Sequence, residues 1–196
     1  MPAPAGNGPM GGISWLTGHL LIAMPAMADP NFVRSVTYIC EHNDQGALGI
    51  VINRPLELEL GEVFQQLALD GAPAAVAGQP VLRGGPMQGE RGFVLHEPAG
   101  KWDATVQVSG FAHLTTSQDI LAALARGTGP KRAMMALGYA GWGAGQLEME
   151  LGANAWLSVP ATATLLYDTP FEARWAAAAA LLGINLATMS PEAGHA

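Results

Sequence analysis

Hydrophobic and polar residues alternate most clearly over residues 34–42, where the period of two predicts a β-strand. The polar residues 43–46 predict a turn, and the apolar run 47–52 predicts a second strand that is buried on both faces. Together the two strands predict a β-hairpin in which the Cys40 thiol and the His42 imidazole lie on the same face. The alternate residues of that face are Val36, Tyr38, Cys40 and His42.

The remaining patterns predict several more strands and fewer helices. Helices are predicted at 60–69, after a Thr116 cap, at 146–151, and from a Thr169 cap to residue 182. Because the helices do not alternate regularly with the strands, the pattern favours the α+β class over a doubly wound parallel sheet. The further predicted strands are 19–24, 81–83, 92–97, 102–108, 111–114, 133–139 and 155–159, with a short extended piece at 165–166.

The chain length of 196 residues suggests a single domain. Residues 1–13 are rich in Pro, Gly and Ala, without charge or periodicity, so a disordered leader is expected ahead of one domain at 14–196. Within that domain, Pro55 is expected to end a strand ladder. The segment 71–80, which is rich in Gly, Pro and Ala, is expected to form a surface loop.

Charge and composition exclude several functional classes. The formal net charge is −7, and the nine Lys and Arg residues are scattered, with only Lys131 and Arg132 adjacent, which disfavours direct binding to nucleic acid. The single cysteine excludes an intramolecular disulfide and suits a reducing compartment. No apolar run approaches 18 residues, and residues 20–28 lack the basic start of a signal peptide, so a cytoplasmic protein without a membrane span is expected.

Cys40 and His42 form the most suggestive chemical pair in the sequence. A neighbouring imidazolium lowers the pKa of a thiol, so Cys40 would act as a catalytic nucleophile and His42 would tune it. Two observations favour a buried structural cysteine instead: Glu41 would oppose a thiolate, and free cysteines are commonly buried. Both interpretations remain open at this point.

The glycine-rich segment 138–145 and the histidines offer weaker signals. A strand, a glycine loop and a helix start can bind an anion, but this spacing matches no phosphate-binding motif, and Glu148 would repel a phosphate. A tight turn with Trp142 packed over it fits the segment better. The five histidines do not have the spacing of metal ligands, so we predict neither a metal nor a cofactor.

Polar or backbone-exposing residues at predicted strand ends suggest a ligand pocket formed by loops. Arg34 and Arg54 flank the hairpin and would attract an anionic small ligand, although turn formation explains most of these positions equally well. The residues of this hypothetical pocket are Arg34, Asn53, Arg54, Gly84, Gly85 and Trp142.

Several long motifs occur in an order that resembles the bacterial YqgE/AlgH family, over about residues 18–196. The resemblance implies a compact α+β domain with an irregular, mainly antiparallel, barrel-like sheet flanked by a few helices. The family has no established biochemical activity, and some members are described as transcriptional regulators. The motifs are LLIAMPAMADPNFVRSVTYICEHN (20–43), GALGIVINRP (46–55), GGP (84–86), GFVLH (92–96), TTSQDIL (115–121) and LGYAGWGAGQLE (137–148).

Three functional hypotheses follow from these observations. The first is a non-enzymatic regulatory or binding protein that acts through an unidentified protein or small-molecule partner, because its charge disfavours contact with DNA. The alternative is a thiol-dependent redox or electrophile-reactive protein that uses Cys40 tuned by His42. The third is a structural homo-oligomer whose exposed strand edges pair.

Overall fold

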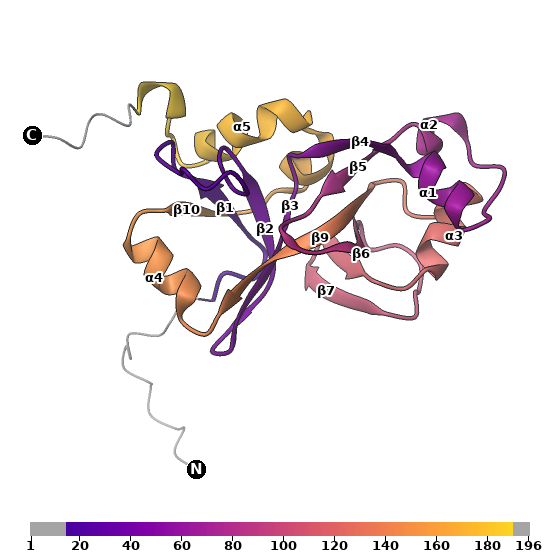
Figure 1. The fold of residues 1–196 in the computed structure, drawn as a ribbon, viewed down its shortest axis with the longest axis horizontal. Helices are drawn as coiled ribbons and strands as arrows, with labels where there is room; N and C mark the ends of the chain where they lie inside the picture. The colour runs from indigo at the N-terminus through magenta and orange to yellow at the C-terminus, as the bar shows by residue number, and fades with distance from the viewer. Residues whose placement is uncertain (1–14, 190–196) are drawn as a thin grey trace, which may run out of the picture.

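The computed structural model describes residues 15–189, which form ten β-strands in one curled, mainly antiparallel sheet (Figure 1). The leader predicted for residues 1–13 lies outside the described residues. The strands are β1 (His19–Ala23), β2 (Val36–Asn43), β3 (Gly46–Val51), β4 (Pro55–Glu59), β5 (Pro80–Arg83), β6 (Met87–His96), β7 (Thr105–Ser109), β8 (Ala112–Thr115), β9 (Ala133–Gly143) and β10 (Trp156–Pro160). Their order along the main path of the sheet is β10-β1-β2-β3-β9-β6-β8-β7. β4 pairs with β5, and β5 lies beside β9 in the only parallel pair among the described strands.

The helical segments are short and lie around the sheet. They are α1 (Leu60–Gln66), α2 (Ala74–Ala77), α3 (Asp119–Ala125), α4 (Gln146–Gly152), α5 (Arg174–Ala180), a π-helix (Thr164–Asp168) and two 3-10 helices (Phe171–Ala173 and Leu186–Thr188). The first three α-helices gather at one end of the molecule, α4 lies at the opposite end, and α5 packs over β1 and β2 (Figure 1). The predicted α+β class with an irregular, barrel-like sheet is confirmed.

The predicted hairpin forms between β2 and β3, but a β-bulge interrupts it at Cys40. Ile39 lies opposite Gly49 and Glu41 lies opposite Leu48, so β2 has one more residue than β3 at this point. Because side chains alternate with a period of two, one extra residue reverses the alternation beyond it. Even-numbered residues of β2 up to Cys40 therefore point to one face of the sheet, and even-numbered residues after Cys40 point to the other face.

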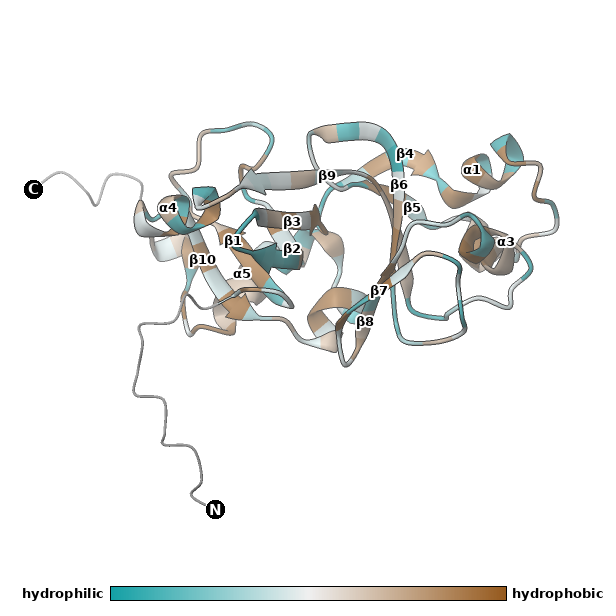
Figure 2. Cartoon of the chain, turned by 90° about the horizontal axis from the view of Figure 1, so that it is seen from below, coloured by the Kyte–Doolittle hydropathy of each residue, from teal (hydrophilic) through white to brown (hydrophobic). Residues whose placement is uncertain are grey.

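Buried side chains form three clusters. The first lies under α5 and the π-helix and includes Tyr38 and Phe93. The second lies between the sheet and the helices α1 and α3, and it includes Phe64. The third packs Trp142 and Trp156 on the part of the sheet that α4 covers. β6 is exposed over its first half and buried over its second, and Figure 2 shows the same change from hydrophilic to hydrophobic along it.

Two segments that were expected to be irregular are regular. Pro55 begins β4 opposite Leu82 of β5, which is allowed because the first residue of an edge strand needs no N–H for the ladder. Glu59 and Glu62 then form the capping box that starts α1. α2 occupies part of the loop that was predicted at 71–80.

Three local predictions in the second half of the chain are wrong. Thr116 does not cap α3, because the N-cap is Gln118 and carries no side-chain hydrogen bond. The piece predicted as extended at 165–166 lies in the π-helix. The Thr169 hydroxyl donates to the carbonyl of Thr164 and closes that π-helix instead of capping α5.

Candidate functional site

Cys40 and His42 lie on opposite faces of the sheet, so their predicted contact is wrong. Cys40 belongs to the cluster under α5, together with Tyr38. His42 points to the other face, where it contacts Leu16 and Glu148. The bulge at Cys40 is the physical reason, because it shifts every later side chain of β2 by one position.

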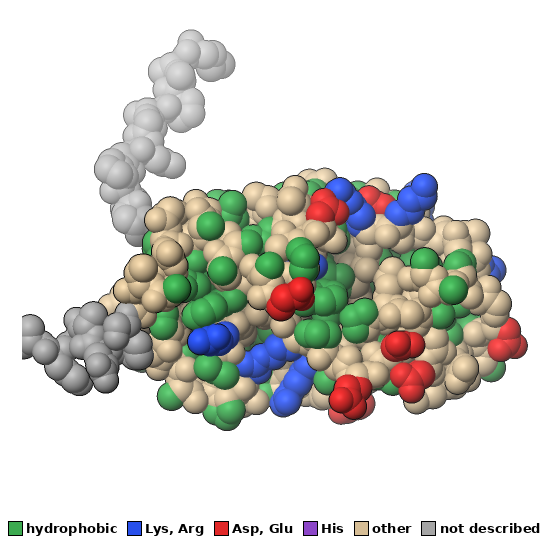
Figure 3. Space-filling view, turned by 90° about the horizontal axis from the view of Figure 1, so that it is seen from above, with side chains coloured by type: hydrophobic (Ala, Val, Ile, Leu, Met, Phe, Trp, Pro, Cys, Tyr) green, Lys and Arg blue, Asp and Glu red, His purple; other side chains and the backbone are tan. Residues whose placement is uncertain are grey.

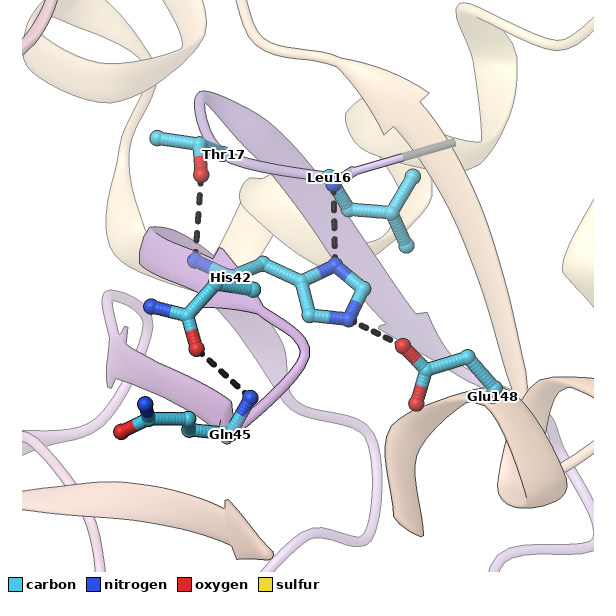
Figure 4. A network of polar contacts seen from close by, with 6 residues as sticks. Leu16, Thr17, His42, Gln45 and Glu148 are labelled. Carbon is cyan, nitrogen blue, oxygen red and sulfur yellow. Dashed lines mark hydrogen bonds and ion pairs between the residues drawn. The ribbon is translucent and has the colours of Figure 1, made fainter. Parts of the chain in front are cut away.

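His42 links the start of the described chain to β2 and α4 (Figure 4). The N–H of Leu16 donates to Nδ1 of His42 at 3.0 Å, so Nδ1 is the acceptor and Nε2 carries the proton. The ring atom Nε2 donates to Oε1 of Glu148 at 2.6 Å, and the backbone N–H of His42 donates to the hydroxyl of Thr17. The pKa of the Glu148 carboxyl is lowered, first by its own backbone N–H and also by the hydrogen bond from His42. Both ring nitrogens of His42 are therefore engaged within the protein, away from Cys40.

The Cys40 thiol sits in an environment that disfavours the thiolate. Burial raises its pKa to about 12, and the nearby charge of Glu41 adds to the increase. The Sγ atom contacts the carbonyl oxygen of Tyr38 at 3.7 Å. These surroundings are those of a core cysteine rather than of an activated nucleophile.

Asn53 and Arg54 organise the loop that connects β1 to β2. Oδ1 of Asn53 accepts from the N–H of Val36, and its Nδ2 donates to the carbonyl of Arg34, both at 2.9 Å. The Arg54 guanidinium donates to three main-chain carbonyls of the same loop, from Pro30, Asn31 and Val33. Both side chains therefore form hydrogen bonds with the backbone of the protein itself.

Gly84 and Gly85 allow two backbone segments to cross closely. A Cβ atom on Gly84 would lie 2.3 Å from the carbonyl oxygen of Gly138. One on Gly85 would lie 2.1 Å from the carbonyl carbon of Tyr139. The absence of a side chain at these two positions serves packing against β9.

Trp142 is a core residue near the end of β9. Its ring packs against Trp156 and Phe32 at centroid distances of 6.1 and 6.2 Å. The glycine-rich segment around it continues β9 to Gly143, and Gly145 then adopts a left-handed conformation before α4. The predicted tight turn is therefore confined to residues 144–145, because 138–143 belong to the strand, and Trp142 packs on Phe32 and Trp156 rather than over the turn.

Arg34 is the one residue of the hypothetical loop pocket that lines a large cavity, of about 800 Å³. Its guanidinium lies over the ring of Trp175 at 5.2 Å. Arg83, on β5, reaches Asn31 in the loop that Arg34 belongs to. In Figure 3, Lys and Arg side chains form separate groups on the face seen from above, and Asp and Glu side chains gather on its right side. The six residues predicted as a pocket do not line a common one.

A groove between α1, α3 and the sheet is a candidate site for a ligand. Its volume of about 390 Å³ falls in the usual range for small-molecule sites. The floor is apolar, whereas hydroxyl and amide groups stand on the rim, and Glu90 is the only charged lining residue. The lining residues of this α1–α3 groove are Leu58, Val63, Gln66, Leu67, Glu90, Gly92, Val94, Thr115, Thr116, Ser117, Gln118, Leu121, Met135 and Leu137.

Sequence reasoning missed the α1–α3 groove because its residues come from distant parts of the chain. Each apolar member fits the pattern of an ordinary core residue, and Val63, for example, is part of the stripe that predicts α1. The run 115–118, with two threonines, a serine and a glutamine, was interpreted as a helix cap. Instead of capping α3, the hydroxyl of Thr115 bonds to His96 and that of Ser117 bonds to Asp119.

A buried hydrogen-bonded row lies beside the α1–α3 groove. Nδ1 of His96 contacts the carbonyl of Glu97 at 2.7 Å, so Nδ1 carries the proton and donates. Nε2 then accepts from the hydroxyl of Thr115 at 2.7 Å, and Thr115 also bonds to the hydroxyl of Thr105. Burial lowers the pKa of His96, in keeping with a neutral imidazole. The row fixes β6, β7 and β8 side by side.

Two further findings concern the described residues only. Among residues 15–189, no three His, Cys, Asp or Glu side chains are grouped so that they could hold a metal ion. No helix in this range is long and apolar enough to cross a membrane.

Comparison with known proteins places the chain among bacterial relatives. A family described as AlgH-like matches residues 20–187. A UPF0301 protein of Nitrosococcus oceani is 53% identical over 93% of this chain and 97% of its own length. A UPF0301 protein of Saccharophagus degradans is 54% identical over 92% of this chain and 89% of its own length.

Solved structures give the same result. The solution structure of the AlgH protein from Pseudomonas aeruginosa is 50% identical, with a TM-score of 0.76 over 98% of this chain and 100% of that one. Protein DIP2367 from Corynebacterium diphtheriae, at 21% identity and a TM-score of 0.61, covers 84% of this chain and 82% of that one and shares the fold. From the family match and these relatives together, the chain belongs to the AlgH-like family.

Proposed function

We propose that this protein is a non-enzymatic binding protein with a regulatory role, and that its α1–α3 groove receives the apolar part of a partner or small ligand. The observation that carries the proposal is the groove itself, which combines a ligand-sized volume with an apolar floor and a polar rim. This combination is typical of sites that bind a ligand by burying its apolar surface and orient the ligand through a few hydrogen bonds.

The lining indicates which kind of molecule fits. Leu58, Leu67 and Leu137 are half-buried and supply apolar surface that a ligand would cover, which contributes about 25 cal/mol for each Å² removed from water on binding. The exposed residues Thr116 and Gln118 offer polar groups at the rim, whereas the hydroxyl of Ser117 is already bonded to Asp119 and to the N–H of Ala104. Because Glu90 is the only charge, the groove favours a neutral or cationic molecule over an anion.

The charge of the chain supports regulation through a partner rather than through DNA. With a net charge of −7, the protein as a whole is repelled by a phosphate backbone. Its Lys and Arg residues occur in separate groups on the face seen in Figure 3, next to carboxylates, and do not form a continuous basic stripe there. A partner protein or a small effector is the better-supported target.

The thiol-dependent alternative has weaker support. It requires an accessible thiol and a contact between Cys40 and His42. Cys40 is only 4% exposed, its pKa is raised by burial, and His42 bonds to Glu148 on the opposite face. We therefore favour binding over thiol chemistry.

Two adjacent residues of α1 offer a matched test. Gln66 lines the rim of the α1–α3 groove, whereas Gln65 is equally exposed and does not line it. Tryptophan at position 66 would obstruct the groove, and tryptophan at position 65 adds the same side chain to the same helix outside it. The probe is the neutral fluorescent dye N-phenyl-1-naphthylamine, whose emission increases in apolar sites.

We expect the native protein and Gln65→Trp to bind the dye saturably with one affinity, and Gln66→Trp to bind at least about tenfold more weakly, a loss of about 1.4 kcal/mol. Equal binding by both variants, or no saturable binding to the native protein, would count against the groove as the site. Circular dichroism of each variant checks that its fold is unchanged.

A further inference from the structure

Arg174 is a buried cation that contacts no carboxylate among the described residues. Its side chain is at the start of α5, and the residue is 2% exposed. Nε donates to the carbonyl of Thr169 at 2.9 Å, and Nη1 donates to the carbonyl of Ile52 at 2.7 Å. The guanidinium also contacts Sδ of Met134 and lies 4.5 Å from the ring centre of Phe171. These neighbours satisfy hydrogen bonds but do not neutralise the charge.

Arg174 lines a cavity of about 370 Å³ in which cations outnumber carboxylates. Three of the nine Lys and Arg residues of the chain line it, against one carboxylate, Asp168, although the chain as a whole carries −7. We call it the Arg174 cavity. Its lining residues are Gln79, Pro80, Lys131, Arg132, Ala133, Met134, Tyr167, Asp168, Phe171 and Arg174.

Burying an uncompensated guanidinium is costly, because a low-dielectric interior solvates charge poorly. Burial lowers the pKa of Arg174 to about 10, which still leaves the group charged at neutral pH. Asp168 cannot serve as its full counter-ion, because it is paired with Arg132 at 2.8 Å. The cavity therefore retains an excess of positive charge that a bound anion would neutralise.

We propose that the Arg174 cavity is a binding site for a phosphate-type oxyanion, either free or as a phosphate ester. Nε and Nη1 of Arg174 donate to the protein itself, so Nη2 supplies the N–H donors for a phosphate oxygen, and Lys131 adds an exposed cation to the lining. The rings of Tyr167 and Phe171 give the organic part of an ester an apolar wall. This site is separate from the α1–α3 groove, and the proposal does not rest on the binding function assigned to that groove.

Two carboxylates oppose the anion and make the proposal testable. Asp168 competes for Arg132, and Glu97 accepts from the backbone N–H groups of Lys131 and Arg132 through Oε1. Removing the charge of Asp168 frees Arg132 for the anion. We therefore expect Asp168→Asn to bind phosphate about two- to fivefold more tightly, the size of one exposed charge interaction. A purely structural Arg174 would leave phosphate binding unaffected by this change.

The test is a titration of the full chain with inorganic phosphate, monitored by two-dimensional ¹H–¹⁵N NMR. The ionic strength is held constant, and a parallel titration with sodium chloride serves as the reference. Saturable shifts are expected for the Lys131 and Arg132 amides and for the Arg174 Nε–H. The double variant Lys131→Ala/Arg132→Ala should bind at least about tenfold more weakly, because it loses two charge-assisted contacts. Both residues are exposed, so the variant is expected to fold.

The matched control is Lys101→Ala/Arg126→Ala, which removes one lysine and one arginine from exposed positions that do not line the Arg174 cavity. It should bind phosphate as the native chain does. Arg174→Lys keeps a charge but loses the planar fork, and about tenfold weaker binding by a folded variant would support the proposal. Non-saturable shifts in the native chain, or equal weakening in the Lys101/Arg126 control, would overturn it.

Discussion

The imidazole of His42 donates to the carboxylate of Glu148 at 2.6 Å, while its other ring nitrogen accepts the N–H of Leu16. One side chain on β2 thereby fixes α4 and the start of the described chain in place. The residue that the sequence pattern suggested as a tuner of Cys40 is instead engaged on the opposite face of the sheet.

Replacing His42 should therefore cost stability rather than alter thiol chemistry. We expect His42→Ala to lower the free energy of unfolding by about 2 kcal/mol, because the Leu16 N–H loses its acceptor and Glu148 loses its donor. A double-mutant cycle with Glu148→Gln in urea should give a coupling energy of about 1 kcal/mol, since the Glu148 side chain is 35% exposed and water screens it. Zero coupling would contradict this account of the contact.

Cys40 should be unreactive in the native protein. Its pKa is raised to about 12 by burial, so the thiolate population at pH 8 is very small, and the side chain is out of reach of reagents. We expect iodoacetamide to label it only as fast as the protein unfolds, with the rate increasing in urea. Rapid labelling at pH 7 without denaturant, slowed by His42→Ala, would restore the thiol hypothesis.

The predicted and observed positions of Cys40 and His42 differ because hydrophobic alternation reveals strands but does not reveal a bulge within a strand. Alternation predicted the β2–β3 hairpin correctly, because each strand buries a face and the period of two follows from that. A bulge adds one residue without changing the hydrophobicity of its neighbours, so the pattern could not reveal the reversal at Cys40.

Tertiary contacts account for the sites that the sequence did not reveal. Asn53 and Arg54 were predicted as ligand contacts because polar side chains at strand ends often bind ligands, yet their partners are loop carbonyls about twenty residues away. Arg174 went unnoticed within the predicted C-terminal helix. The available signal was a lone cation directly before the apolar run 175–182, but its burial depends on contacts with Ile52, just after β3, and Thr169, just after the π-helix.

The crossing of Gly85 over β9 predicts a sharp difference between two glycines. A Cβ on Gly85 would lie 2.1 Å from the carbonyl carbon of Tyr139, whereas one on Gly89 would meet nothing within 4 Å. We expect Gly85→Ala to lower the free energy of unfolding by at least about 2 kcal/mol, and Gly89→Ala to change it by less than about 0.5 kcal/mol. Equal midpoints for both variants in chemical denaturation would show that the backbone crossing is looser than described.

His96 should make the fold sensitive to acid. Its pKa is lowered from 6.5, chiefly by burial, so below pH 6.5 the unfolded chain binds a proton that the folded chain does not. Stability is then fully present above pH 6.5 and falls as the pH is lowered from there towards the folded-state pKa. Urea unfolding between pH 7.5 and 5.5 should show this slope, and His96→Gln should reduce it. An unchanged slope in that variant would assign the acid sensitivity to other groups.

If the α1–α3 groove is a binding site, an apolar probe should bind there, and NMR can map where the probe binds. The measurement is a ¹H–¹⁵N NMR titration of the native chain with the neutral dye N-phenyl-1-naphthylamine. We predict saturable shifts concentrated at the amides of Gln66, Ser117, Gln118 and Leu121, which line the groove. Shifts concentrated instead around Arg34 and Trp175, which line the cavity of about 800 Å³, would contradict the claim, as would shifts spread over the surface without saturation.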